Sequence, residues 1–319
     1  MMNQLDQLKQ FSTVVVDSGD LEEIKQYQAT DATTNPSIIL NTLKNEKYTH
    51  FLDSSIEYAK THVKTLEQQI KLASLKVAVD IGKELLTIVP GFVSTEVDAR
   101  ASFDIEQSIR IAEQIIELYD KENVDTSRVL IKLAATWQGI KAAGILEQKG
   151  IKTNLTLIFS KAQAIAAADS GAFLISPFVG RITDWYTKNN LLESGRDPGV
   201  ESVKEIYTLF KSQNIPTIVM GASFRNTAQI LSLSGCDRLT ISPALLEKLK
   251  QSHHPIVQIL NSNFINKTKR NSKMIESDFY WEHNSSEMAV AKLSEGIRGF
   301  AKDQITMESL LLSKLNQSN

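Results

Sequence analysis

Lys132 is the residue best suited to chemistry, because it stands alone in an apolar run, Val-Leu-Ile-Lys-Leu-Ala-Ala. If that run is a buried strand, the side chain has little access to water, and desolvation disfavours the ammonium form. A neutral amine can attack a carbonyl carbon and form an imine, or Schiff base. The alternative is a structural lysine whose charged head reaches solvent past its apolar stem.

Two carboxylates, Asp17 and Glu96, follow short apolar runs of the same kind. Aldol cleavage requires removal of a hydroxyl proton, and carboxylates in altered surroundings can move protons in this way. As alternatives, Asp17 could interact with the helix that follows it, and Glu96 could form a salt bridge to Lys132. Carboxylates could also bind magnesium. A lysine in the same cavity would supply the electrophilic assistance instead, so we predict neither a metal nor a cofactor.

Two arginines follow later apolar runs, in Pro-Phe-Val-Gly-Arg181 and Gly-Ala-Ser-Phe-Arg225. Paired guanidinium groups, the hydroxyl of Ser223 and backbone amides beside Gly221 could bind a phosphate group. The alternative is that both arginines form surface salt bridges. Asn35 is also a candidate ligand, although Pro36 suggests that it caps a helix; the two roles are compatible, because helix N-termini attract anions.

The elements that must position these residues are short apolar runs that alternate with helical patterns, as in parallel strands buried on both faces. Eight such strands are predicted, at Thr13–Asp17, Ala29–Thr34, Phe92–Val97, Val129–Ala134, Thr153–Ile158, Phe173–Pro177, Thr217–Gly221 and Arg238–Ile241. Val77–Ile81 resembles a ninth strand, but it continues without a turn signal to Pro90. We therefore predict one long helix through about Val89, with Gly82 in its interior.

Eight strands with alternating helices predict a closed (β/α)8 barrel, also called a TIM barrel, with additional C-terminal helices. A doubly wound open sheet is the competing fold. That fold favours a glycine-rich dinucleotide loop after the first strand, and Val-Asp-Ser-Gly-Asp20 is not such a loop. Residues 286–300 carry apolar residues at helical spacing, and no linker is evident. We expect a single domain over residues 1–319 that includes this helical tail.

Several helix ends are readable in the sequence. The stretch from Asp20 to Glu23 resembles a capping box, and Asn35 precedes a proline in the first helical position. Gly150, Gly171 and Gly235 stand where helices should end before the next strand.

Chemistry in a (β/α)8 barrel takes place at the C-terminal ends of the strands. Nearly every predicted strand places a polar side chain at this end, which indicates one shared cavity. In chain order these residues are Asp17, Thr33 and Asn35, Glu96, Lys132, Asn154 and Thr156, Ser176, and finally Ser223 and Arg225.

The composition limits the other classes of function. The 319 residues are 42% hydrophobic and 23% charged, with a formal net charge of −2 and one cysteine, Cys236. A single basic cluster at 267–273 does not predict nucleic-acid binding. The lone cysteine excludes an internal disulfide framework, and no apolar stretch approaches the ~20 residues of a membrane span. We expect a cytoplasmic protein without membrane or nucleic-acid partners.

The sequence resembles the transaldolase family, and the resemblance extends over essentially the whole chain. Its motifs are Val14-Val-Val-Asp-Ser-Gly19, Asp31-Ala-Thr-Thr-Asn-Pro-Ser37, Val93-Ser-Thr-Glu-Val-Asp-Ala-Arg100, Ile131-Lys-Leu-Ala-Ala-Thr-Trp137, Thr153-Asn-Leu-Thr-Leu157, Ile175-Ser-Pro-Phe-Val-Gly-Arg181 and Met220-Gly-Ala-Ser-Phe-Arg225.

The resemblance implies a class I aldolase-related enzyme of the non-oxidative pentose phosphate pathway. Such an enzyme transfers a dihydroxyacetone unit from sedoheptulose 7-phosphate or fructose 6-phosphate to glyceraldehyde 3-phosphate or erythrose 4-phosphate. Bacterial members are commonly homodimers.

The resemblance also implies a role for each site residue. Lys132 matches the imine-forming lysine, Asp17 the group that takes the C4 hydroxyl proton, and Glu96 the acid/base that works through a water near Thr156. The other matched residues are Asn35, Asn154 and Ser176 with Thr33 nearby for the dihydroxyacetone unit, Arg181, Ser223 and Arg225 for phosphate, and Phe178 for the pocket wall.

Two alternatives remain open. A fructose 6-phosphate aldolase would release free dihydroxyacetone without an acceptor, but such enzymes are shorter and lack the C-terminal tail. A catalytically silent sugar-phosphate-binding protein should lack Lys132, Asp17 or Glu96, and all three are present.

Overall fold

Eight parallel strands close into a barrel in the computed structural model, which describes residues 2–270 and 272–317. Each strand pairs with its neighbours in chain order, and β1 closes the barrel against β8. The predicted (β/α)8 fold is therefore confirmed. The strands are β1 Thr13–Asp17, β2 Asp31–Thr33, β3 Val93–Glu96, β4 Val129–Ala134, β5 Thr153–Ile158, β6 Leu174–Pro177, β7 Ile218–Gly221 and β8 Arg238–Ile241.

Four strands have the predicted bounds, whereas β2, β3, β6 and β7 are shorter than predicted. The apolar composition extends into connecting residues, most of them buried or half-buried, that lie outside the assigned strands. Phe92, for example, is half-buried; its carbonyl accepts from the backbone N–H of Ala32, but its own N–H donates to the carboxylate of Asp31 at 2.7 Å. Composition therefore reports burial more directly than it reports strand pairing.

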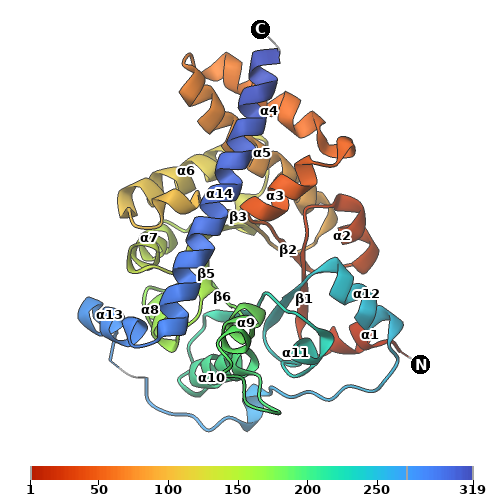
Figure 1. Ribbon diagram of the computed structural model, residues 1–319, viewed down its shortest axis with the longest axis vertical. Coiled ribbons are helices and arrows are strands. Elements are labelled where there is room, and N and C mark those ends of the chain that lie inside the picture. The colour runs from red at the N-terminus through yellow and green to blue at the C-terminus, as the bar shows by residue number, and fades with distance from the viewer. Residues whose placement is uncertain (1, 271, 318–319) are drawn as a thin grey trace.

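Helices surround the barrel and cover its outer face (Figure 1). They are α1 Gln4–Leu8, α2 Leu21–Tyr27, α3 Pro36–Leu43, α4 His50–His62, α5 Leu66–Ile88, α6 Ile105–Lys121, α7 Trp137–Gln148, α8 Lys161–Asp169, α9 Gly180–Lys188, α10 Pro198–Ser212, α11 Thr227–Leu231, α12 Pro243–Gln251, α13 Glu276–Asn284 and α14 Glu287–Gln317, with short 3-10 turns η1 Glu46–Tyr48, η2 Ala99–Ala101, η3 Thr126–Arg128 and η4 Ser262–Phe264. Within the described residues, no helix is long and apolar enough to cross a membrane.

The long helix α5 replaces the possible ninth strand, as predicted. Gly82 is needed in its interior because any larger residue would bring a Cβ into collision with the hydroxyl of Tyr119. That hydroxyl forms a 2.6 Å hydrogen bond with Thr95 of β3. This glycine lets the helix lie close to its neighbours, and that close packing offsets the unfavourable helix propensity of glycine.

The predicted helix ends are largely confirmed. Asn35 accepts a hydrogen bond from the backbone of Ile38 as the N-cap of α3, and all three predicted stop glycines have left-handed backbone angles. Asp20 caps α2, but the capping-box prediction is wrong in one respect. Glu23 accepts a hydrogen bond from the hydroxyl of Ser18 at 2.8 Å, and the same Ser18 oxygen accepts from the backbone N–H of Asp20.

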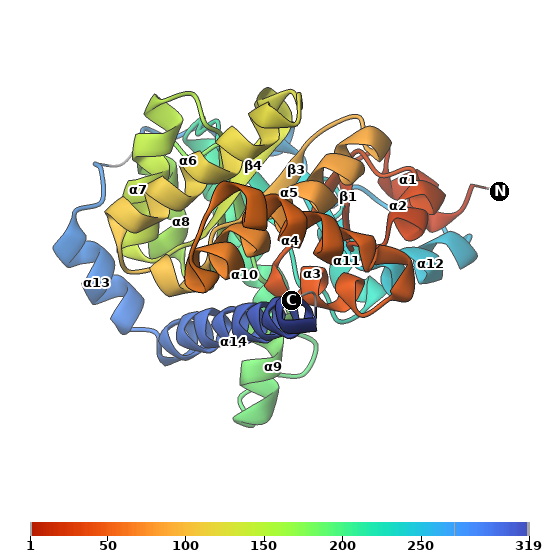
Figure 2. The ribbon, with the colours of Figure 1, turned by 90° about the horizontal axis from the view of Figure 1, so that it is seen from above.

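The last helix, α14, crosses one face of the barrel. Figure 1 shows it passing in front of the strands from α13 towards α4, and Figure 2 shows it along one side of the molecule beside α9. It packs on α3, α5, α9 and β5. Its buried apolar residues join a cluster that includes Phe159 and Phe178, so the C-terminal tail helps to build the end of the barrel where the candidate site lies.

The basic cluster of the sequence lies in the segment that leads to α13. Lys267 donates to the backbone carbonyl of Lys211 at 2.8 Å, and Arg270 pairs with Asp169 at 3.1 Å. Asn271, within the cluster, lies outside the described residues.

Candidate active site

A cavity of about 210 Å³ opens at the C-terminal ends of the strands. Ten of the twelve predicted site residues line it, which places polar groups from β1, β2, β4, β5, β6, the loops after β2 and β7, and the first turn of α9 around one space. They are Asp17, Thr33, Asn35, Lys132, Thr156, Ser176, Phe178, Arg181, Ser223 and Arg225. The other two, Glu96 and Asn154, contact this group without lining the cavity.

Lys132 projects from the middle of the buried strand β4 and is only 5% exposed. Its Nζ lies 3.1 Å from Glu96 Oε2 and donates to the backbone carbonyl of Thr34 at 3.1 Å. The parallel register places Glu96 of β3 directly beside Lys132. The amine is thus held by two acceptors, at the inner end of a cavity large enough for a small substrate.

Of the two carboxylates near Lys132, the side chain of Glu96 is only 3% exposed, and Asp17 is half-buried in the cavity wall. Burial raises the pKa of Asp17, although the positive charge of Lys132 and a hydrogen bond from Thr33 act in the opposite direction. Burial likewise raises the pKa of Glu96 against the opposing charge of Lys132. The Thr33 hydroxyl donates to Asp17 Oδ1 at 3.0 Å. Two carboxylates with raised pKa values next to an amine can exchange protons with bound groups.

Thr156 lies beside a local distortion of β5. The next residue, Leu157, has a φ of +58°, and the pairing of β5 with β6 shifts register between Leu155 and Ile158. Among the described residues, Thr156 Oγ1 is buried without a hydrogen-bond partner. Glu96 Oε2 likewise has no hydrogen-bond partner there, although it forms an ion pair with Lys132. Both oxygens therefore retain hydrogen-bonding capacity for a water or a substrate hydroxyl.

A chain of hydrogen bonds fixes the polar side chains deeper in the barrel. The Ser176 hydroxyl donates to Asn154 Oδ1 at 2.6 Å, and Asn154 Nδ2 donates to Ser94 Oγ at 3.0 Å. On the opposite side, Thr33 Oγ1 lies 2.8 Å from Thr240 Oγ1. These bonds hold the side chains in single orientations, which favours recognition of a small polyol.

The two arginines differ in how they are held. Arg181 has no ion pair or hydrogen bond with any residue that the structure describes. Its guanidinium lies 5.0 Å from the ring of Phe178 and 5.6 Å from that of Phe300. Burial, and then the charge of Arg225, lowers the pKa of Arg181. A largely buried guanidinium without an anionic partner indicates an anion site, because its N–H donors would otherwise remain unsatisfied.

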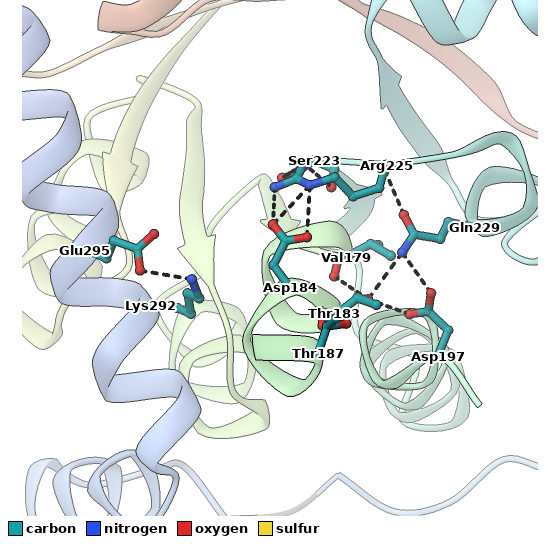
Figure 3. A network of polar contacts seen from close by, with 10 residues as sticks. All are labelled: Val179, Thr183, Asp184, Thr187, Asp197, Ser223, Arg225, Gln229, Lys292 and Glu295. Carbon is teal, nitrogen blue, oxygen red and sulfur yellow. Dashed lines mark hydrogen bonds and ion pairs between the residues drawn. The ribbon is translucent and has the colours of Figure 1, made fainter. Parts of the chain in front are cut away.

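Arg225 is already paired with a carboxylate. Its Nη2 lies 2.7 Å from Asp184 Oδ2, and its Nη1 donates to Ser223 Oγ at 3.3 Å (Figure 3). The pair sits near the mouth of the cavity, where both side chains are partly exposed. Ser223, which also lines the cavity, has a φ of +61°.

Sequence reasoning missed several residues of the cavity wall. Thr240 of β8 could have been found by the rule that polar residues near strand ends face the cavity. Phe300 could not, because it lies on α14 and its spacing indicated only packing. The other missed residues are Met220, Ala222, Phe224 and Ser242.

Glu96 lines a second, larger cavity of about 540 Å³ between α3, α5, η2, α6 and α14. This cavity also contains Arg100, whose guanidinium pairs with Asp98 and Glu308. Glu96 therefore contacts Lys132 and also borders this second cavity.

A buried lysine next to two carboxylates at the C-terminal end of a (β/α)8 barrel defines a class of enzyme that forms Schiff bases with carbonyl substrates. Comparison with known proteins identifies the family. The sequence profile described as Transaldolase/Fructose-6-phosphate aldolase matches residues 14–311, and the chain belongs to this family. It is an enzyme, a transferase of the transaldolase type.

Curated relatives match the chain over nearly its full length. Transaldolase A of Salmonella typhimurium is 56% identical over 319 residues, which cover 98% of this chain and all of the relative. Transaldolase 2 of Salmonella paratyphi A is also 56% identical with the same coverage. Transaldolase A of Escherichia coli K12 is 53% identical over 320 residues, again covering 98% of this chain and all of the relative.

Proposed function

We propose that the chain transfers a dihydroxyacetone unit between sugar phosphates in the non-oxidative pentose phosphate pathway. The donor is sedoheptulose 7-phosphate or fructose 6-phosphate, and the acceptor is glyceraldehyde 3-phosphate or erythrose 4-phosphate. Lys132 carries the three-carbon unit as a Schiff base. The observation that carries this proposal is the burial of Lys132 between Glu96 and the cavity that Asp17 also lines.

In the first half of the reaction, Lys132 Nζ attacks C2 of the ketose, and the carbonyl oxygen leaves as water. Glu96 moves the protons of this step, through a water that it shares with Thr156. The C3–C4 bond then breaks and its electron pair enters the imine to give an enamine. Asp17 takes the proton of the C4 hydroxyl, and the aldehyde leaves.

In the second half, the enamine carbon attacks the carbonyl carbon of the acceptor, and Asp17 returns its proton to the new hydroxyl. Water then hydrolyses the imine and releases Lys132. Asn35, Asn154 and Ser176, with Thr33 nearby, hold the hydroxyls of the three-carbon unit. Because the unit stays covalently attached between two aldehydes, ping-pong kinetics are expected.

The phosphate group lies between Arg181, Ser223 and Arg225, with Phe178 in the wall. Arg181 supplies the unpaired guanidinium, and Ser223 and Arg225 close the site from the loop after β7. A phosphate at the cavity mouth leaves the carbonyl end of an extended sugar chain to reach Lys132.

The direct test is trapping with borohydride. Fructose 6-phosphate is incubated with the enzyme, sodium borohydride is added, and peptide mass mapping locates the adduct. We expect a reduced three-carbon adduct on Lys132. No adduct, or an adduct on another lysine, would contradict the proposed mechanism.

The family also includes fructose 6-phosphate aldolases, which would release dihydroxyacetone without an acceptor. The two activities are separated by measuring free dihydroxyacetone from fructose 6-phosphate with and without erythrose 4-phosphate. We expect little release without the acceptor and rapid formation of sedoheptulose 7-phosphate with it.

We further propose that the enzyme acts in the cytoplasm as a homodimer and that residues 1–319 form one domain, with residues 1, 271, 318 and 319 outside the described structure. Packing of α14 on the barrel supports the single domain. Light scattering of the purified chain would test the dimer.

A further inference from the structure

Ser223 and Leu157 share an unusual backbone geometry. Among residues 2–270 and 272–317, six residues other than glycine have positive φ angles, and four of these, Gln28, Asn123, Asn190 and Asn214, cap or closely follow a helix. The other two, Leu157 and Ser223, lie at the C-terminal ends of β5 and β7. Side chains larger than hydrogen are unfavourable in this region, so the surroundings must hold both residues there.

Each of the two sites is followed by a glutamine in the third position of the next helix. Gln163 of α8 donates to the carbonyl of Leu157 at 3.0 Å and accepts from the backbone N–H of Phe159 at 2.8 Å. Gln229 of α11 accepts from the backbone N–H of Arg225 at 2.8 Å. The same device therefore occurs twice, once beside Thr156 and once beside the proposed phosphate ligands.

Gln229 is only 3% exposed and ties the loop after β7 to two other helices. Its Nε2 donates to Asp197 Oδ2 at 2.8 Å and to Thr183 Oγ1 at 3.2 Å (Figure 3). Asp197 in turn caps α10, and its other oxygen accepts from the hydroxyl of Thr183 at 2.8 Å. One amide thus connects the backbone of Arg225 to the N-terminus of α10 and to α9.

The other side of the loop is held by α9. The backbone N–H of Gly180 donates to the carbonyl of Ser223 at 2.7 Å, and a Cβ at Gly180 would collide with that carbonyl. The loop at Ser223 is therefore held at two points: Gly180 binds the carbonyl of Ser223, and Gln229 binds the backbone N–H of Arg225. Removing either restraint lets the backbone relax out of the left-handed region.

We propose that Gln229 is a positioning residue that determines the preference of the enzyme for phosphorylated substrates. It holds the backbone of the loop so that the hydroxyl of Ser223 and the guanidinium of Arg225 face the phosphate group. It touches neither the substrate nor Lys132. This inference rests on the phosphate site proposed above.

The test compares erythrose 4-phosphate with erythrose, using fructose 6-phosphate as the donor. In Gln229→Ala, we expect kcat/KM for erythrose 4-phosphate to fall on the order of tenfold, because the phosphate ligands lose their fixed geometry. The value for erythrose should change less than about twofold. An equal loss for both acceptors, or no loss for either, would overturn the proposal. Gln251→Ala, at the exposed end of α12, is the control and should leave both values unchanged.

A pair of charge-exchanging variants guards against simple misfolding. Gln229→Glu alone places a carboxylate opposite the carboxylate of Asp197, so the two repel. Asp197→Asn alone either places two amide N–H groups opposite each other or turns the Gln229 amide away from Arg225. Combined, the new carboxylate accepts from the backbone N–H of Arg225 and from the new amide at 197, so these two hydrogen bonds re-form and only the donation to Thr183 is lost. We expect each single variant to lose the phosphate preference and the double variant to recover most of it. A double variant no better than either single one would contradict the proposal.

Two measurements separate this inference from the phosphate site on which it rests. The wild-type enzyme should prefer erythrose 4-phosphate to erythrose, and Arg225→Gln should reduce that preference. If either fails, the phosphate site is wrong. If both hold while Gln229→Ala keeps the full preference and the same inhibition by inorganic phosphate, only the role of Gln229 is wrong.

Discussion

The region around Lys132 and the region around Arg225 solve different physical problems. Lys132, Asp17 and Glu96 lie on barrel strands. The side chains of Lys132 and Glu96 are almost unexposed, Asp17 is half-buried, and the charge of Lys132 acts on both carboxylates. Arg225 and Ser223 lie on a loop, near the mouth, and depend on helices α9, α10 and α11 for their positions.

Reactivity at Lys132 and recognition at Arg225 thus place different demands on the fold. A buried amine and carboxylates with raised pKa values need a rigid, dry setting, which the inner strands provide. The groups proposed to bind phosphate on the loop after β7, Ser223 and Arg225, lie near solvent. Hydrogen bonds from residues of α9, α10 and α11 hold this loop in place, rather than burial.

The largest effect is expected when the amine of Lys132 is removed. In Lys132→Ala, exchange should fall by at least about a thousandfold for phosphorylated and unphosphorylated acceptors alike, because no covalent carrier remains. Steady-state exchange and circular dichroism would show lost activity in a folded protein. Lys161→Ala, which removes an exposed lysine paired with Glu205, is the control and should retain activity. Retained exchange in Lys132→Ala would contradict the assignment.

Asp17 should set the acidic limb of the pH profile of kcat/KM. The carboxylate form is needed to accept a proton, so activity falls as the pH drops through its pKa. Because burial raises that pKa, the acidic limb of kcat/KM should lie above the range of an exposed aspartate, near 3.9. Asp17→Asn should lower kcat about 10²- to 10⁴-fold. If the same acidic limb persists in that variant, another group is responsible for it.

Arg181 should contribute more than Arg225 to the binding of erythrose 4-phosphate. Arg181→Gln should raise KM for erythrose 4-phosphate roughly 10- to 100-fold, since a charge-assisted hydrogen bond contributes about 1.5–3 kcal/mol. Arg225→Gln should have the smaller effect, because Asp184 already occupies part of its guanidinium. Erythrose serves as the internal control and should be little affected. A larger effect at Arg225 would reverse the ranking.

The smallest effect is expected at Phe300, which connects the tail to the phosphate region. Phe300→Leu keeps an apolar side chain but removes the ring near Arg181. A cation–π contact contributes about 0.5–1 kcal/mol, so KM for erythrose 4-phosphate should rise roughly two- to fivefold with little change in kcat. A fall in kcat for erythrose as well would show instead that α14 supports the chemistry around Lys132.

Much of the fold could be predicted because barrel strands are buried on both faces and leave compact apolar runs. The runs at Val129–Ala134 and Thr153–Ile158 have the bounds that the structure shows. The second strand was predicted as Ala29–Thr34, longer than the observed Asp31–Thr33, because buried residues outside the ladder, such as Ala29 and Thr34, have the same composition as a strand. The reciprocal capping at Asp20 failed because Ser18 supplied a nearer partner for Glu23.

From the sequence alone one can predict which groups could react and in which order they surround the barrel, because each strand places its C-terminal residues at the same end. The matched motifs also predicted ten of the residues that line the cavity, but they missed six others, including Thr240 and Phe300. The tertiary contacts were needed to find which arginine lacks an anionic partner within the described part of the chain, which ring of α14 reaches the cavity, and which glutamine holds the loop after β7. Those facts depend on contacts between segments far apart in the chain, and no local pattern of residues encodes such contacts.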